Sequence, residues 1–255
     1  MNSQHQVTDP ERLTRAHVLP FAVFMGFMLV LQLVGGFIEW KHPDAPWWRQ
    51  DPAQLIYPIQ TLVTLAVLGH YRRFYRFEMS LKWALVGILF GAVGIGFWLL
   101  PSALHGVWGL AGKSGGVLKF LGVVERKQGF DPGLFQNPLA YWSALLCRFL
   151  RAVVVVALIE EIFWRGFLMR FVGDWDGDYW KQPFGRANWR SYWIVTGLFM
   201  LAHAPVDYAG AWVYGSLTYG LCVWTKNLGA CVVMHGTANL LMGVYIMHTG
   251  NYGLW

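Results

Sequence analysis

The sequence has 255 residues, of which 56% are hydrophobic and only 13% are charged. Soluble domains carry about 25% charged residues, so this composition excludes an ordinary soluble domain and indicates a protein that crosses the lipid bilayer several times. The net charge of +6 does not indicate a nucleic-acid partner, because basic residues gather at the ends of membrane spans and no basic patch interleaved with aromatics stands out. Fifteen tryptophans and eleven tyrosines suit the interfacial belts of a membrane protein.

Apolar runs predict an all-α, polytopic transmembrane bundle of about seven helices, in a single integral membrane domain over residues 1–255. The predicted helices cover residues 18–38, 54–70, 81–100, 139–172 (one long helix or a broken pair), 191–204, 209–225 and 229–248. Residues 101–138 are predicted to form a long loop with a short interfacial helix at 115–124, and an eighth helix is expected if this loop re-enters the membrane. Gly87 and Gly91 have the spacing that allows close helix packing.

Basic residues also predict the orientation. With the N-terminus inside, the inner segments hold twelve Lys and Arg residues and the outer segments hold eight, four of them in the long loop 101–138. Because long loops count weakly, this distribution predicts a cytoplasmic N-terminus, with Glu160 near the cytoplasmic end of its helix.

Two adjacent carboxylates, Glu160 and Glu161, interrupt the apolar run 153–168, and Arg165 follows four residues after the second. An ionisable group at a membrane helix centre costs roughly 2.5–3.5 kcal/mol on insertion scales, so it is kept where it is paired or used. At about 100° per residue, Glu161 and Arg165 share one helix face, whereas Glu160 lies about 140° away from Arg165. The spacing predicts that Arg165 neutralises Glu161 and leaves Glu160 as a candidate general base. The alternative is that both carboxylates share the arginine at a helix end near the headgroups.

Two further polar pairs lie in apolar helices. Phe199 and His203 are four residues apart, as are His235 and Asn239, so each pair shares a helix face. Together the polar groups could hydrolyse a peptide bond: Glu160 would take a proton from water that His203 holds, and His235 and Asn239 would donate to the oxyanion. This arrangement needs no cofactor. The alternatives are histidines that serve only in packing and a metal site with Glu160, His203 and His235 as ligands.

Other protease chemistries find no support. No histidine is followed by glutamate, so the zinc motif HExxH is absent, and Ser216 lacks the first glycine of GxSxG. Three aspartates lie together in the polar loop 173–190 and none lies in a predicted span, so an aspartyl dyad within the spans is not expected. The cysteines, Cys147, Cys222 and Cys231, match no metal motif and are expected to be packing residues.

Three motifs occur in order: EExxxRG at residues 160–166, FxxxH at 199–203 and HxxxN at 235–239. Together they resemble the three motifs of the CPBP family, the CAAX proteases and bacteriocin-processing enzymes, also called the Abi family. This family comprises glutamate-type intramembrane endopeptidases. The resemblance covers residues 140–250, which would carry the catalytic core, while the N-terminal half is similar only in having spans.

The resemblance implies a role for each motif residue. Glu160 would be the water-activating glutamate, with His203 as its partner. His235 and Asn239 would stabilise the oxyanion. The substrate would be a membrane-associated polypeptide, and the resemblance says nothing of the oligomeric state.

The same resemblance implies a structural ion pair between Glu161 and Arg165. The C-terminal run 239–255 is also similar to a bacterial subgroup of CAAX-protease-related proteins that is linked to exosortase and PEP-CTERM sorting systems. This similarity implies a bacterial cytoplasmic (inner) membrane, where a prenylated substrate is not expected because bacteria lack that general modification route.

Two functions of other classes stay open at this point. A non-catalytic membrane scaffold or chaperone-like binder could use the same fold, because a fold does not guarantee a chemistry. A small-solute transporter also places charges within a bundle, although the sequence lacks an inverted repeat.

Overall fold

The structure, a computed structural model, describes residues 9–37, 46, 51–108 and 116–255, and in this part of the chain the regular elements are helices. Ile38, the end of the first predicted span, and part of the predicted loop lie outside the described residues. The helices are α1 (Pro10–Phe37), α3 (Pro52–Tyr71), α4 (Leu81–Val107), α5 (Val117–Phe120), α6 (Pro138–Phe149), α7 (Ala157–Glu161), α8 (Met169–Gly173), α9 (Trp189–Leu201), α10 (Tyr208–Thr225) and α11 (Leu228–Thr249).

Two π-helical segments, η3 (Leu150–Val156) and η4 (Ile162–Leu168), join α6, α7 and α8 into one helix over Pro138–Gly173. The sequence left open whether this region is one helix or a broken pair, and the structure has one. Counted this way, the described residues form seven helices of 13 residues or more, plus the short α5, which confirms the predicted helical membrane bundle. Five of the seven are long and apolar enough to cross a membrane; α9 and α10 are not among these five.

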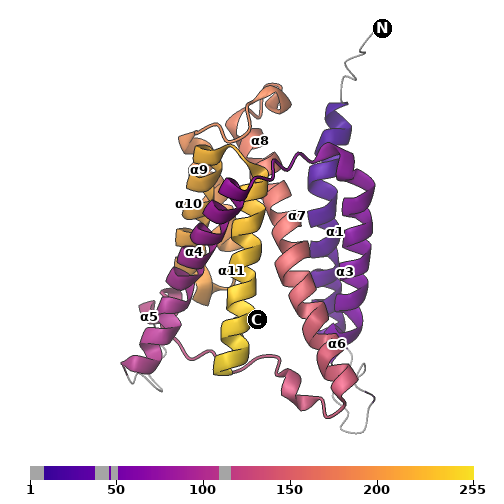
Figure 1. The fold of residues 1–255 in the computed structure, drawn as a ribbon, viewed down its shortest axis with the longest axis vertical. Helices are drawn as coiled ribbons and strands as arrows, with labels where there is room; N and C mark the ends of the chain where they lie inside the picture. The colour runs from indigo at the N-terminus through magenta and orange to yellow at the C-terminus, as the bar shows by residue number, and fades with distance from the viewer. Residues whose placement is uncertain (1–8, 38–45, 47–50, 109–115) are drawn as a thin grey trace.

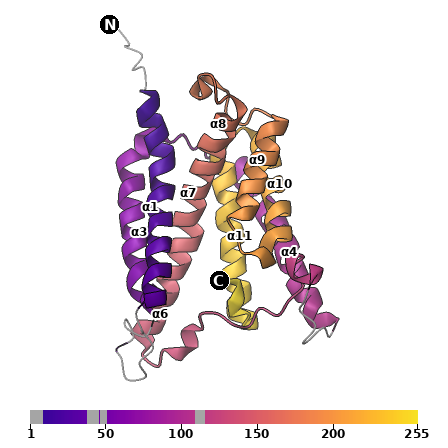
Figure 2. The same cartoon turned by 180° about the vertical axis from the view of Figure 1, so that it is seen from behind.

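The long helix α6–α8 lies in the middle of the bundle. On one side it packs against α1 and α3, and on the other side against α11 and α9, with α4 and α10 beyond (Figure 1). In the view from behind, the long helix again lies between α1 and α3 on one side and α11 on the other, with left and right exchanged (Figure 2). The middle helix carries the two glutamates, so both groups of helices can bring side chains toward them.

Helix ends follow local sequence signals. Asn137 precedes α6 and accepts hydrogen bonds from the Leu139 and Ala140 amides, with Pro138 at the first helical position. Asn188 and Asn227 cap α9 and α11 in the same way. Asparagine caps of this kind satisfy amides that have no partner within the helix.

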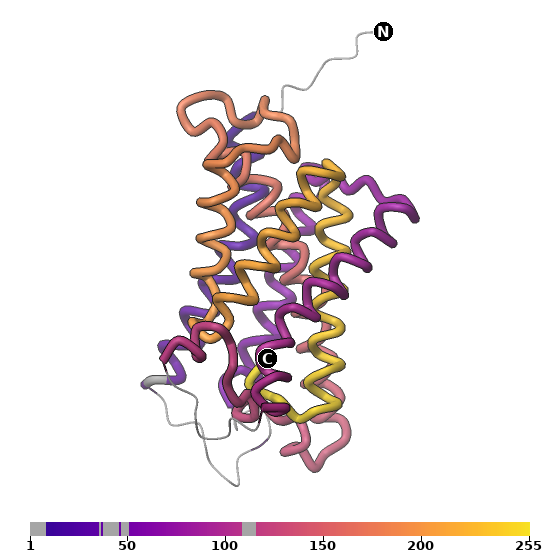
Figure 3. Tube along the Cα trace, turned by 90° about the vertical axis from the view of Figure 1, so that its left-hand side faces the viewer, coloured from indigo at the N-terminus to yellow at the C-terminus, as the bar shows by residue number. Residues whose placement is uncertain are grey.

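The close packing predicted at Gly87 and Gly91 is present between α4 and α11, which cross in Figure 3. A Cβ atom on Gly87 would lie 2.7 Å from the Ala230 carbonyl oxygen, and one on Gly91 would lie 2.5 Å from the Met234 carbonyl oxygen. Only glycine allows this approach, which brings the backbone of α11 against α4 at Ala230 and Met234.

Several predicted boundaries were wrong. The first helix begins at Pro10 rather than at residue 18, because its polar first turns remain helical beyond the apolar run. The third helix continues through Pro101 to Val107 rather than ending at residue 100. The interfacial helix expected at 115–124 is shorter and covers Val117–Phe120.

Candidate active site

Glu161 is the centre of a buried polar cluster. Its side chain is fully buried and Arg165 is 2% exposed, and the Arg165 Nε atom lies 3.3 Å from Glu161 Oε2. The His235 Nδ1 atom, which comes from α11, lies 2.8 Å from Glu161 Oε1. An ionised carboxylate can only accept hydrogen bonds, so His235 donates from Nδ1 and its Nε2 remains for other partners. Glu161 therefore joins the long helix to α11.

Glu160 has a different environment from its neighbour. Within the described residues it forms no ion pair, and its Oε2 atom is buried without a hydrogen-bond partner. The arrangement matches the expectation from helical spacing, in which Arg165 lies beside the second glutamate only. Glu160 is thus a carboxylate with an oxygen available to take a proton.

The π-helical segments flank the two glutamates, with η3 ending just before α7 and η4 beginning just after Glu161. Such segments often mark functional sites because they change the direction of side chains and carbonyls. In η3, the Ala152 carbonyl oxygen accepts a hydrogen bond of 2.7 Å from Asn239 Nδ2. One N–H of the Asn239 amide is thus engaged in holding α11 to the long helix.

His203 lies just beyond the last residue of α9. Its Nδ1 donates to the Phe199 carbonyl oxygen over 2.7 Å, so its Nε2 is the nitrogen left for chemistry. Among the described residues, no hydrogen bond joins His203 to Glu160 or His235. The structure therefore pairs His235 with Glu161 directly but does not bond His203 to the other predicted catalytic residues.

Aromatic rings connect His203 with the Glu161 cluster instead. The Phe199 ring contacts the His203 ring at 4.7 Å between centroids, and the Arg165 guanidinium lies 5.2 Å from the Phe199 centroid. Tyr214 of α10 continues the row, with its ring 6.2 Å from Phe199 and 5.8 Å from His235. The phenylalanine of the second motif is therefore a packing centre that fixes both a histidine and the arginine.

Three residues outside the motifs hold His203 from the other side. The Trp98 ring makes an edge contact with His203 at 5.2 Å, and Trp98 Nε1 donates to Asp207 Oδ1 over 3.3 Å. Arg126 donates to both Asp207 oxygens, at 2.8 and 3.2 Å, and this pair is mostly buried. Sequence reasoning missed these residues, because they are far apart in the chain and no spacing relates them.

The three-ligand metal arrangement is not formed. Over the residues that the structure describes, no three His, Cys, Asp or Glu side chains are grouped so that they could hold a metal ion. Glu160, His203 and His235 are therefore not grouped closely enough to ligate one metal ion, as the alternative interpretation requires. The three cysteines are free thiols, and Cys222 and Cys231 are buried.

An apolar groove of about 370 Å³ lies between the long helix and α11. It is lined by Val153, Val154, Leu158, Val232, Val233, Gly236, Thr237 and Leu240. The groove is open and comes from the same two helices that carry Glu160 and His235. An apolar segment of another molecule could therefore approach these helices from the side.

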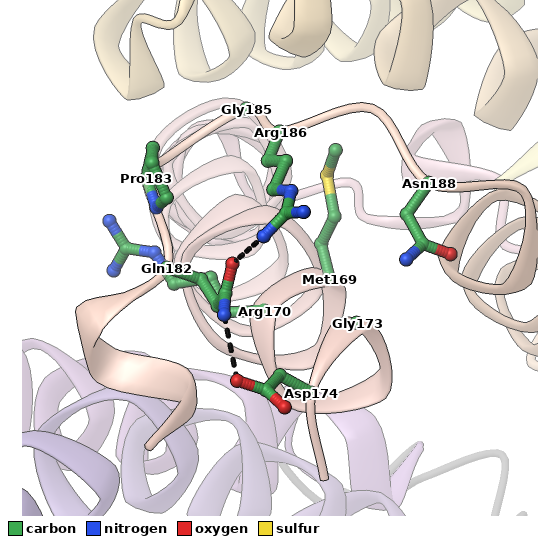
Figure 4. Close-up of a pocket in the computed structure, with 9 residues that line it drawn as sticks. All are labelled: Met169, Arg170, Gly173, Asp174, Gln182, Pro183, Gly185, Arg186 and Asn188. Carbon is green, nitrogen blue, oxygen red and sulfur yellow. Dashed lines mark hydrogen bonds between the residues drawn. The ribbon is translucent and has the colours of Figure 1, made fainter. Parts of the chain in front are cut away.

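A smaller polar pocket of about 190 Å³ lies beyond the end of α8 (Figure 4). There Gln182 Nε2 donates to Asp174 Oδ2 over 2.7 Å, and Arg186 donates to Gln182 Oε1. None of the predicted catalytic side chains lines it. These bonds hold the 173–190 loop together rather than form part of the site.

Part of the chain matches a known protein family. Residues 142–241 match the family model Rce1-like, described as type II CAAX prenyl endopeptidase Rce1-like. The matched segment contains all three motifs, so the match confirms the resemblance to CAAX proteases and supports an intramembrane endopeptidase. No curated protein and no solved structure gives a significant match.

Proposed function

Since residues 142–241 match the Rce1-like family of CAAX endopeptidases, we propose that the protein cleaves a membrane-associated polypeptide with water activated by Glu160. One observation carries the proposal. Of two adjacent glutamates, Glu161 is bound by Arg165 and His235, while Glu160 has no ion pair in the described part of the chain. Two carboxylates side by side thus have different environments, which is how one can be structural and the other catalytic.

In the proposed reaction Glu160 takes a proton from water as the water oxygen attacks the carbonyl carbon of the peptide bond. The π electrons of the carbonyl move to its oxygen, which becomes an oxyanion. When the carbonyl re-forms, the C–N bond breaks and Glu160 returns the proton to the leaving nitrogen. The products are one new carboxyl terminus and one new amino terminus.

The remaining site residues would position these atoms. His203 has Nε2 free to hold the water, because Nδ1 is bonded to Phe199. His235 can donate from Nε2 to the oxyanion as an imidazolium, with Glu161 balancing its charge through Nδ1. Asn239 has one amide N–H beyond its bond to Ala152 for the same oxygen.

The apolar groove between the long helix and α11 supports a substrate that arrives from the membrane. We place the protein in a bacterial cytoplasmic membrane with its N-terminus inside, on the basis of the basic-residue distribution and the similarity to a bacterial subgroup.

The experiment compares the membrane proteomes of cells that carry the parent protein or Glu160→Gln, at equal expression, by mass spectrometry of protein C-termini. We expect C-termini that appear only with the parent, because the amide cannot take a proton from water. Identifying them names the substrate together with its cleavage position. Glu160→Gln should unfold at the parent's temperature, since Glu160 forms no ion pair that the change would break.

Identical C-termini from two folded proteins would instead favour the non-catalytic scaffold. New termini with Glu160→Gln as abundant as with the parent would mean that another residue activates the water. Solute uptake by proteoliposomes that contain the protein would favour a transporter.

A further inference from the structure

Tyr214 is a buried side chain with an unused hydrogen-bond donor. The residue is 3% exposed, and its hydroxyl has no hydrogen-bond partner in the residues that the structure describes. Burying a hydroxyl without a partner is unfavourable, and native proteins seldom leave one so unless it has a role. Phenylalanine would fill the same space without this cost.

The position of Tyr214 connects the hydroxyl with the proposed chemistry. Its ring contacts the His235 ring edge-on at 5.8 Å, and His235 is in turn hydrogen-bonded to Glu161 over 2.8 Å. Two other buried hydroxyls, those of Thr64 and Thr196, also lack a partner among the described residues.

The tyrosine ring is held firmly. It packs against Phe199 at 6.2 Å and Trp98 at 6.0 Å between centroids. On its remaining side is Gly94 of α4, where a Cβ atom would lie 2.8 Å from the ring. A donor fixed in this way needs no reorganisation during a reaction, which is the property that makes donors effective in stabilising a developing charge.

An oxyanion can accept up to three hydrogen bonds, so a third donor can act beside His235 Nε2–H and the second N–H of Asn239. Asn239 gives one of its two amide hydrogens to Ala152, and His235 gives Nδ1–H to Glu161. We propose that Tyr214 is a catalytic residue whose hydroxyl donates a hydrogen bond to the oxyanion formed from the substrate carbonyl. This inference rests on the proposed endopeptidase function and adds to it a residue outside the three motifs. No proton is transferred to the oxyanion; the phenol only donates a hydrogen bond.

The test is Tyr214→Phe, which removes one oxygen and keeps the ring. The probe is the set of parent-specific C-termini defined by the comparison with Glu160→Gln, followed over time after induction. We expect these termini to form about 100-fold more slowly, since loss of one oxyanion donor costs about 10²- to 10³-fold in rate. The thermal midpoint of the purified variant should equal or exceed that of the parent, because a buried hydroxyl without a partner has been removed.

Tyr219→Phe is the matched control on the same helix. The Tyr219 hydroxyl accepts from the Asn188 amide and donates to the Asn188 carbonyl oxygen, both over 2.9 Å. Loss of this hydroxyl should lower the thermal midpoint and leave the rate of formation of the parent-specific C-termini unchanged. This is the opposite of the pattern expected for Tyr214→Phe.

Three outcomes would overturn the inference. A rate like the parent's in Tyr214→Phe would leave the hydroxyl without a catalytic role, and a lower thermal midpoint with a lower rate would make the role structural. If Glu160→Gln gives the same termini as the parent, the endopeptidase proposal fails and this inference fails with it. Failure of the endopeptidase proposal can be told apart from failure of the Tyr214 inference, because it is seen in Glu160→Gln, where Tyr214 is unchanged.

Discussion

His235 Nδ1 lies 2.8 Å from Glu161 Oε1, although the two residues are 74 positions apart in the chain. The second glutamate of the adjacent pair thus holds both an arginine on its own helix and a histidine on α11. Changes at the two glutamates should therefore have separate effects: loss of activity at constant stability for Glu160, and loss of stability for Glu161.

Arg165→Leu should destabilise the protein. Glu161 is fully buried, so removing Arg165 breaks a buried ion pair and leaves the carboxylate with His235 as its remaining partner, which costs about 3–5 kcal/mol. Glu161→Gln should act in the same direction, because the amide weakens the bonds to both Arg165 and His235. Thermal unfolding of the purified proteins in detergent measures the effect.

Arg15→Leu provides the comparison for Arg165→Leu. Arg15 pairs with Glu11 on α1, four residues earlier, but both side chains are more than 60% exposed. Exposed pairs contribute little, so this change should leave the free energy of unfolding within about 0.5 kcal/mol of the parent's. A stable but inactive Arg165→Leu would show that the arginine acts in catalysis and that its structural assignment is wrong.

Gly91→Ala should separate α4 from α11. The added methyl group would lie 2.5 Å from the Met234 carbonyl oxygen, which belongs to backbone and cannot move aside easily. We expect a loss of about 1–3 kcal/mol, typical of overpacking. Gly96→Ala on the same helix is the control, because no atom lies within 4 Å of its added methyl group, and it should be neutral or slightly stabilising. Equal stability of the two variants would contradict the close approach of the helices.

The fold was predictable from the sequence where local chemistry decides it. Apolar runs predicted each long helix, and the four-residue spacing of Gly87 and Gly91 predicted the close contact with another helix. Boundaries were harder to predict, because a polar first turn such as that after Pro10 and a proline such as Pro101 both remain helical here. In the sequence pattern, polar residues and prolines that remain within a helix look the same as those that end one.

The site was predictable only in part, for a related reason. Spacing along one helix predicted that Arg165 lies beside Glu161, since both residues are on one face. It could not predict that His235 also binds Glu161, or that Tyr214 lies beside His235, because helix packing sets these contacts. The π-helical segments were missed as well, since they look like ordinary apolar helix in the sequence.

Arg126→Leu should reduce both stability and activity. The Arg126 guanidinium forms a bidentate ion pair with the Asp207 carboxylate, and the two side chains are 11% and 14% exposed. Asp207 also accepts a hydrogen bond from Trp98, whose ring contacts His203. Loss of the arginine leaves a mostly buried carboxylate without its cation, and we expect a cost of about 2–4 kcal/mol. The measurements are the thermal midpoint and the rate of formation of parent-specific C-termini.

Lys127→Leu is the control for Arg126→Leu. Lys127 pairs with Glu125 in the same loop, but these side chains are 74% and 56% exposed, so the change should have little effect on either measurement. If Arg126→Leu lowers stability while the rate stays at the parent's value, the ion pair holds the loop and does not position His203.

Asn239→Ala tests what the bond to Ala152 does. The variant leaves the part-buried Ala152 carbonyl oxygen without its 2.7 Å donor, and loss of a hydrogen bond of this kind costs about 0.5–1.5 kcal/mol. We expect the thermal midpoint and the cleavage rate to fall together, because the bond both joins α11 to the long helix and orients the remaining amide N–H. His248→Ala, an exposed position near the end of α11, should change neither. A large loss of rate at the parent's stability would mean that Asn239 serves the oxyanion alone and that the helices do not depend on its bond to Ala152.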